Sequence, residues 1–171
     1  MLDQTQLTRQ EAIDRLRDFG IQGEQVYLID LIPLVEMIWA DGSAQQSEVA
    51  IFETYLEQHI ARINTLAGYS ILTIEAAQTF IQRFLTERPS KKLLQTLRSL
   101  IPPIRLANSD DTANQALRKS LLQGCLDIAA SSVTEYPYES IERFCSPEKQ
   151  CWFEIFETLK AADRSQTAHS N

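Results

Sequence analysis

The feature that most constrains the fold of this chain is a long apolar stretch at residues 26–40. Apart from one tyrosine, its only ionisable side chains are Asp30 and Glu36. A helix that is apolar on nearly every face is buried among other elements, so we expect a central helix over 23–40. Pro33 removes a backbone donor from the middle of this helix and predicts a kink. The alternative is two short helices that break before Pro33.

Elsewhere the apolar residues recur at every third or fourth position, and no useful length of sequence alternates with a period of two. This spacing is typical of helices. We therefore predict an all-α protein, a helical bundle of about seven helices. Besides the central helix, the expected helices cover residues 8–20, 44–66, 74–88, 91–101 (ended by Pro102 and Pro103), 112–130 and 147–164, with a short helical segment over 140–144.

A chain of 171 residues can bury roughly 70% of the surface of its unfolded state, so it needs neither a disulfide nor a metal to fold. We expect one domain over 1–164 and a disordered tail over 165–171. The tetrapeptide Ile-Phe-Glu-Thr occurs twice, at 51–54 and at 155–158. This faint repeat predicts two related halves, 8–88 and 89–164, that share one core.

The formal net charge is −7. Because a nucleic-acid backbone needs a basic protein surface, this charge argues against a nucleic-acid partner. It favours cations or basic proteins as partners. No apolar run approaches about 18 residues, so we expect no membrane-spanning helix.

The three cysteines, Cys125, Cys145 and Cys151, have no paired spacing. They suit a reducing compartment and give no zinc signature. The polar residues 1–10 do not form a signal peptide. These features predict a cytoplasmic protein.

Asp41 and Glu48 lie at the corner between the expected helices over 23–40 and 44–66. We expect Gly42 to end the first helix and Ser43 to cap the second, with Gln46 completing a capping box. An acidic side chain at the C-terminal end of a helix is unfavourable unless a positive charge approaches. A hard divalent cation such as Ca²⁺ or Mg²⁺ can bind carboxylates and backbone carbonyls there. Asp41 and Glu48 are therefore our candidate metal ligands.

The simpler interpretation stays open, because Asp-Gly is a common turn and Glu48 can be a solvated residue near a helix start. The corner is not an EF-hand, since Met37 and Trp39 stand where its first two oxygen ligands belong. Asp30 precedes Asp41 by about 16 Å of helix and cannot share its ion. We expect Asp30 to meet a lysine or arginine, or to lie on a narrow exposed strip.

The sequence predicts no catalytic residue and no organic cofactor. His59 falls within the apolar stripe of the helix over 44–66, and we expect a partly buried, hydrogen-bonded histidine there rather than a metal ligand beside Glu57. The other histidine, His169, lies in the predicted tail, so no Ser-His-acid set can be assembled. A glycine-rich phosphate loop is also absent.

The segment 31–56 resembles the TerB-like tellurite-resistance family. It contains an apolar helix ending in Ala40-Asp41-Gly42, followed by a capped helix with a glutamate six residues after the glycine. The resemblance implies an all-helical TerB-like domain of two related halves and a divalent metal ion at Asp41 and Glu48. The second half departs from the pattern, because Ser131 and Ser132 replace the expected Asp-Gly and Gln150 stands close to the expected second glutamate.

We predict a non-enzymatic module of a bacterial stress response related to tellurite resistance. A divalent cation at Asp41 and Glu48 would fix the helix corner and a surface for protein partners. The resemblance implies partners at the cytoplasmic face of the inner membrane. One rival is a metal-free helical scaffold or interaction domain. Another is a hydrolase with a carboxylate-bound metal, which a pocket holding Asp30 or Glu36 beside the corner would favour.

Overall fold

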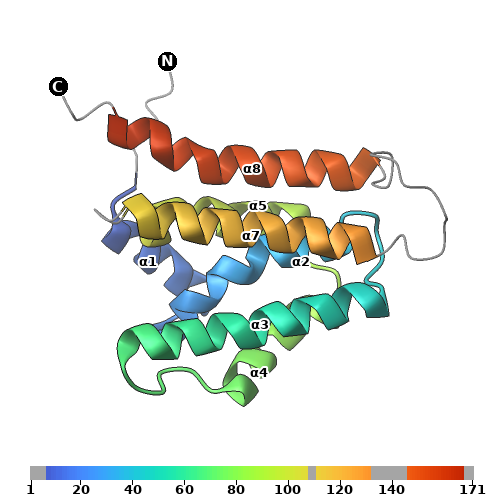
Figure 1. Cartoon of the computed structure of the whole chain (residues 1–171), viewed down its shortest axis with the longest axis horizontal. Coiled ribbons are helices and arrows are strands. Elements are labelled where there is room, and N and C mark those ends of the chain that lie inside the picture. Colours follow the sequence, from blue (N-terminus) through green and yellow to red (C-terminus); the bar gives the residue numbers. More distant parts are fainter. Residues whose placement is uncertain (1–6, 108–110, 132–145, 168–171) are drawn as a thin grey trace.

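The computed structural model describes residues 7–107, 111–131 and 146–167, and within these ranges every regular element is a helix (Figure 1). The predicted all-α class is therefore confirmed. In chain order the elements are α1 (Arg9–Asp18), the 3₁₀ helix η1 (Gly23–Leu31), α2 (Ile32–Trp39), α3 (Gln46–Ala67), α4 (Ile74–Leu85), α5 (Lys91–Ser99), α6 (Ile101–Arg105), α7 (Asp111–Ser131) and α8 (Ser146–Thr167).

Helix α2 occupies the centre of the bundle. Every residue from Ile32 to Ile38 is buried, and α2 contacts α3, α5, α7 and α8. In Figure 1, α7 lies between α3 and α8 and runs in the opposite direction to both. The first residues of α3 and α8 consequently lie at the same end of the molecule, beside the end of α2.

The predicted single helix over 23–40 is wrong, and the alternative of two short helices is correct. Residues Gly23–Leu31 form η1, and α2 begins at Ile32 with Pro33 in its first turn. A proline is well placed at this position because the first N–H groups of a helix have no partner within the helix. Pro33 therefore starts a helix instead of kinking one.

A second correction concerns Pro102 and Pro103, which were expected to end a helix over 91–101. Helix α5 already ends at Ser99, and α6 (Ile101–Arg105) holds both prolines at its start. The physical reason is the same preference of proline for the first turn of a helix.

The buried apolar side chains from α1 to α8 form one contiguous cluster. Its fully buried members include Phe52 of α3, Ile128 of α7 and Ile155 of α8. Helix α8 extends to Thr167, so it overlaps the predicted tail over 165–171. The rest of that tail and the predicted segment 140–144 lie outside the described residues. In the described part of the chain no helix is both long enough and apolar enough to cross a membrane.

Candidate metal site

A tight turn holds Asp41 directly after α2. The N–H of Gly42 donates to the carbonyl of Trp39 over 2.9 Å, and Gly42 has a φ of 98°, which favours glycine. Oδ1 of Asp41 accepts from the N–H of Ser43 over 3.1 Å, and its Oδ2 accepts from the side chain of Gln45 over 3.4 Å. The turn predicted from Asp-Gly is present, and it orders an exposed carboxylate.

Glu48 lies in the first turn of α3 and is only 1% exposed. Its Oε2 accepts from the N–H of Gln45 over 3.4 Å, which forms one half of a capping box. The expected cap at Ser43 with Gln46 is therefore wrong, because Ser43 takes part in the Asp41 turn and α3 starts two residues later. Capping by Gln45 leaves Glu48 pointing into the helix corner.

A third carboxylate, which the sequence reasoning missed, completes the cluster. Glu148 lies in the first turn of α8 and is 3% exposed. One carboxylate oxygen from each of Asp41, Glu48 and Glu148 lies within 4.8 Å of the other two. The sequence Ser146-Pro147-Glu148 marked a helix start, but no local signal placed that start beside Asp41.

The three carboxylates repel one another. The pKa of Glu48 is raised from 4.5 to about 7, mainly because the group is buried and further because of the charges of Asp41 and Glu148. The hydrogen bond from Gln45 opposes this rise. A cation among the three groups would remove both causes, because it would replace lost solvation and cancel the repulsion.

The donor set suits a hard cation. Carboxylate oxygens are ligands for Ca²⁺ and Mg²⁺, both of which also retain water molecules in many protein sites. Asp41 is exposed, so the cluster meets solvent at this carboxylate. The arrangement of Asp41, Glu48 and Glu148 can therefore hold a divalent metal ion.

The second half of the chain contributes Glu148 and not the residues that the family pattern suggested. Gln150 is exposed and donates to Glu154 over 3.1 Å. Ser131 ends α7 and donates to the carbonyl of Ile128, and Ser132 lies outside the described residues. No second Asp-Gly corner accompanies the first in the described ranges.

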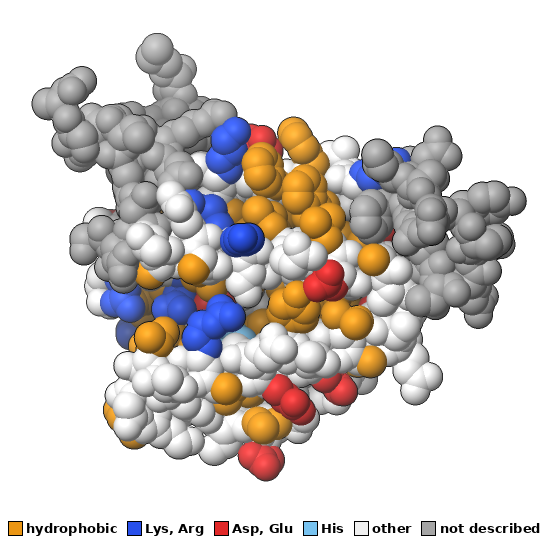
Figure 2. Space-filling view, viewed as in Figure 1, with side chains coloured by type: hydrophobic (Ala, Val, Ile, Leu, Met, Phe, Trp, Pro, Cys, Tyr) orange, Lys and Arg blue, Asp and Glu red, His pale blue; other side chains and the backbone are white. Residues whose placement is uncertain are grey.

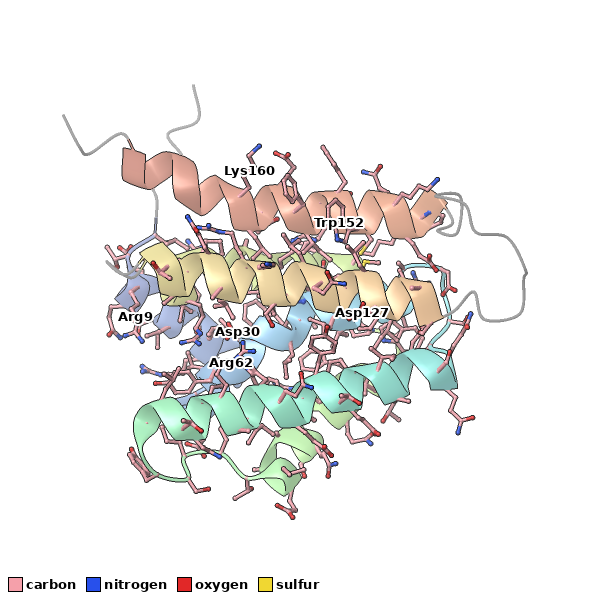
Figure 3. The ribbon with its side chains drawn as sticks, viewed as in Figure 1. Arg9, Asp30, Arg62, Asp127, Trp152 and Lys160 are labelled. Carbon is pink, nitrogen blue, oxygen red and sulfur yellow. The ribbon has the colours of Figure 1, made fainter. Side chains whose placement is uncertain are left out.

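Asp30 lies away from this site, as expected (Figure 3). It is fully buried, and both of its oxygens accept from Nε of Arg105, over 2.9 and 3.2 Å. Nε2 of His59 lies 2.9 Å from the carbonyl oxygen of Tyr27 and 3.4 Å from Asp30. The predicted arginine partner of Asp30 and the buried, hydrogen-bonded state of His59 are both confirmed.

Glu36 lines a pocket of about 140 Å³ between α2, α5 and α8. This pocket also includes Ala40 and Pro147, the chain neighbours of Asp41 and Glu148. We stated above that a pocket holding Asp30 or Glu36 beside the corner would favour a hydrolase. The pocket lined by Glu36 is such a pocket.

Hydrophobic side chains gather over α8 on the face shown in Figure 2. Phe153 is 55% exposed. The rings of Trp152 and Phe156 stack with their centroids 5.4 Å apart, and Nζ of Lys160 lies 5.5 Å from the Phe156 ring centre. This α8 aromatic face, made by Trp152, Phe153 and Phe156, begins one helical turn beyond Glu148.

Comparison with known proteins gives no relative: no family model, curated protein or solved structure matches this chain. The candidate function therefore rests on the site's own chemistry and on the resemblance of segment 31–56.

Proposed function

We propose that this chain is a TerB-like, non-enzymatic module of a bacterial stress response related to tellurite resistance, and that a divalent cation controls it. The observation that carries the proposal is the approach of Asp41, Glu48 and Glu148 to within 4.8 Å of one another. Two of these carboxylates are buried. Burying two carboxylates beside a third is costly, and a bound cation would offset that cost.

The proposed mechanism is a cross-link between three elements. Asp41 belongs to the turn after α2, Glu48 to the start of α3 and Glu148 to the start of α8. An ion bound to all three would hold α8 against the α2–α3 corner. Without the ion, like-charge repulsion would loosen the contact between them. The cation would thus control the position of α8 by local electrostatics.

The α8 aromatic face is the surface that such a change would present to a partner. Aromatic side chains are enriched at protein interfaces, and Phe153 is more than half exposed at 55%. We propose protein partners for this face, in the cytoplasm and at the inner membrane. The two related halves implied by the family resemblance belong to the same proposal.

One specific contact favours the first rival, a metal-free scaffold. A Cβ atom added to Gly42 would lie 3.6 Å from Nη1 of Arg88, so the Arg88 guanidinium lies next to the acidic corner. An arginine at this place can neutralise part of the cluster without an ion. In that case the corner would be a structural ion network, and α8 would not respond to metals.

The pocket lined by Glu36 favours the second rival, a carboxylate-metal hydrolase. Hydrolysis of this kind needs a metal-bound water and a nearby acid or base. Burial raises the pKa of Glu36 to about 8, against the opposing effect of Arg98, so a proton-transfer group near the corner is available. Cation-dependent cleavage of p-nitrophenyl phosphate that Glu36→Gln abolishes would replace our proposal with this rival.

The deciding experiment is thermal unfolding of metal-stripped protein titrated with Ca²⁺, Mg²⁺, Mn²⁺ and Zn²⁺. An ion that binds only the native state stabilises it by about 2.7 kcal/mol at about 100 times Kd. We expect this gain in the wild type and its loss in Asp41→Ala and Glu148→Gln. The control is Glu53→Gln, which removes one exposed carboxylate of α3 and should keep the gain.

A wild type that no ion stabilises would refute the cation-controlled module and leave the metal-free scaffold. Equal stabilisation of all variants would place the ion elsewhere on the protein, which also contradicts the proposal. Repeating the titration with Arg88→Gln separates the roles of the arginine and the ion. If Arg88 replaces the metal, its removal should create cation dependence that the wild type lacks.

A further inference from the structure

A groove of about 250 Å³ is lined by the turn after α1 and by helices α4 and α5. Its accessible walls include Phe19, which is 38% exposed, and the half-buried Pro89 and Leu93. Behind them, the buried Ile21 and Leu97 also line the groove and belong to the core. Exposed apolar surface of this kind can mark a ligand-binding groove. The walls of the groove therefore offer an apolar surface that an alkyl group can cover.

Arg83 of α4 places a positive charge at this groove. Its guanidinium carbon lies 4.4 Å from the ring centre of Phe80 and 4.8 Å from that of Phe84. Cation–π attraction to these two rings holds the guanidinium in place. Among the residues that the structure describes, none forms a hydrogen bond or an ion pair with Arg83. Because the side chain is exposed, a ligand can reach its N–H groups.

The guanidinium of Arg83 suits a carboxylate. Its surroundings disfavour the charge, since burial lowers the pKa of Arg83, but an arginine stays charged in proteins. A partly desolvated cation gains from an anionic partner. The planar guanidinium can donate two parallel hydrogen bonds to one carboxylate. A carboxylate on an alkyl chain would therefore match both the charge and the apolar walls.

Two further charged residues line the groove, and both are exposed. Glu87 repels an anion and Arg88 attracts one, so their effects on an anionic ligand oppose each other. Nη1 of Arg88 would lie 3.6 Å from a Cβ atom added to Gly42, which places this guanidinium beside the acidic corner. Arg83 is therefore the better placed of the two arginines to receive a carboxylate in the groove.

We propose that this groove binds a short-chain aliphatic carboxylate, a free fatty-acid anion of about six carbons. Its carboxylate accepts hydrogen bonds from Arg83, and its alkyl chain covers Phe19 and Leu93. At about 30 Å³ per non-hydrogen atom, roughly the volume of one water molecule in the liquid, a groove of about 250 Å³ holds about eight such atoms, the number in hexanoate. The site is separate from the Asp41, Glu48 and Glu148 cluster and does not depend on the function proposed for it.

The test is a backbone-amide NMR titration of the full chain with hexanoate, hexanol and hexylamine. The three probes share a six-carbon chain and carry a negative charge, no charge and a positive charge near neutral pH. A ligand of about eight non-hydrogen atoms can reach a Kd of the order of 1 mM. We expect hexanoate to bind about three- to fivefold more tightly than hexanol at low salt, as for an exposed charge pair, and hexylamine to bind most weakly.

The shifted amides should lie in α4, α5 and the turn after α1. Shifts confined to another surface would overturn the proposal. No detectable binding of hexanoate, equal binding of hexanol, or tighter binding of hexylamine would overturn it as well.

Chain length tests the apolar walls. Full burial of one methylene group contributes a factor of about four in affinity, and an open groove that buries about half of it should contribute a factor of about two. Hexanoate has three more methylene groups than propionate and should bind about eightfold more tightly. Equal binding of the two carboxylates would show an adventitious ion only and overturn the proposal.

Two charge variants locate the carboxylate. Arg83→Gln should weaken hexanoate binding about three- to fivefold at low salt and leave hexanol binding unchanged. Glu87→Gln removes a repulsive charge and should strengthen hexanoate binding about twofold. The matched control is Arg62→Gln, because Arg62 is an exposed arginine of α3 that does not line the groove. Equal weakening by the Arg83 and Arg62 variants would show a general charge effect and overturn the assignment.

Phe19→Ala tests the groove even if Arg83→Gln alters the fold. Removal of this ring shortens the apolar wall, so the eightfold preference for hexanoate over propionate should fall to about fourfold or less. An unchanged preference would place the alkyl chain elsewhere and refute the proposed site.

Discussion

Glu48→Gln tests the electrostatics of the acidic corner most directly. The amide has nearly the shape of the carboxyl group, and a glutamine at this position can still form the capping box with Gln45. The substitution therefore removes the charge of Glu48 and its titration while the start of α3 is kept. The wild type and this variant should differ only in how their stability depends on pH and on cations.

The sign of the pH effect follows from the raised pKa of Glu48. Between pH 4.5 and about 7 the folded protein keeps a proton that the unfolded chain has released. The contribution of Glu48 to the stability of the metal-free wild type should therefore be largest below pH 4.5 and be lost as pH rises through this window. Above about pH 7 both states are deprotonated and the contribution of Glu48 is constant.

The magnitude has an upper bound. The rise in the pKa of Glu48 from 4.5 to about 7 corresponds to a loss of about 3 kcal/mol of folding stability, at about 1.36 kcal/mol per pKa unit. Solvent reaches the cluster at the exposed Asp41 and screens part of the repulsion. We therefore expect Glu48→Gln to be more stable than the metal-free wild type by about 1–2 kcal/mol at pH 8, with no such gain at pH 4.5.

The assay is urea unfolding followed by circular dichroism at pH 4.5, 5, 6, 7 and 8 in the presence of a chelator. Glu36 also has a raised pKa, but it titrates in both proteins, so the difference between them isolates Glu48. Saturating cation should reverse the order and make the wild type the more stable protein at pH 8. Parallel pH curves for the two proteins would refute the reasoning.

Two further predictions concern the core. Arg105→Met should lower the free energy of unfolding by about 3 kcal/mol, measured by urea unfolding at pH 7, because it leaves the fully buried Asp30 without its arginine; unchanged stability would contradict the role of this ion pair. Gly124→Val should destabilise by about 1–3 kcal/mol in the same assay, because even a Cβ there would lie 3.1 Å from Tyr55 and 3.2 Å from Leu34; Gly124→Ala should have the smaller effect.

The helical class was predictable because the period of the apolar residues decides it. The helix boundaries at the prolines were not. Pro33 is compatible both with a kink inside one helix and with the start of another, and the local sequence does not choose between them. In the structure η1 packs against α4, α5 and α6, whereas α2 packs against α3, α5, α7 and α8, and these long-range contacts have no signal in the local sequence. The same ambiguity explains the error at Pro102.

The candidate metal site was also predictable only in part. Asp41 and Glu48 could be paired from the sequence because one turn separates them, and a glycine marks that turn. Glu148 could not, because only the antiparallel course of α7 and α8 brings the start of α8 beside the start of α3. A contact between segments this far apart has no signal in the period or spacing of either segment.

The position of the cluster at three element ends suits it to the control by a cation that we propose. Helix starts carry partial positive charge, which favours carboxylates such as Glu48 and Glu148. This effect and the hydrogen bond from Gln45 act against burial and mutual repulsion, yet the pKa of Glu48 is still raised to about 7. The balance therefore leaves an electrostatic cost at the junction of three elements, which a cation can remove. Because α8 also carries the aromatic face with the exposed Phe153, relief of that cost would link ion binding to the surface that we propose for a partner.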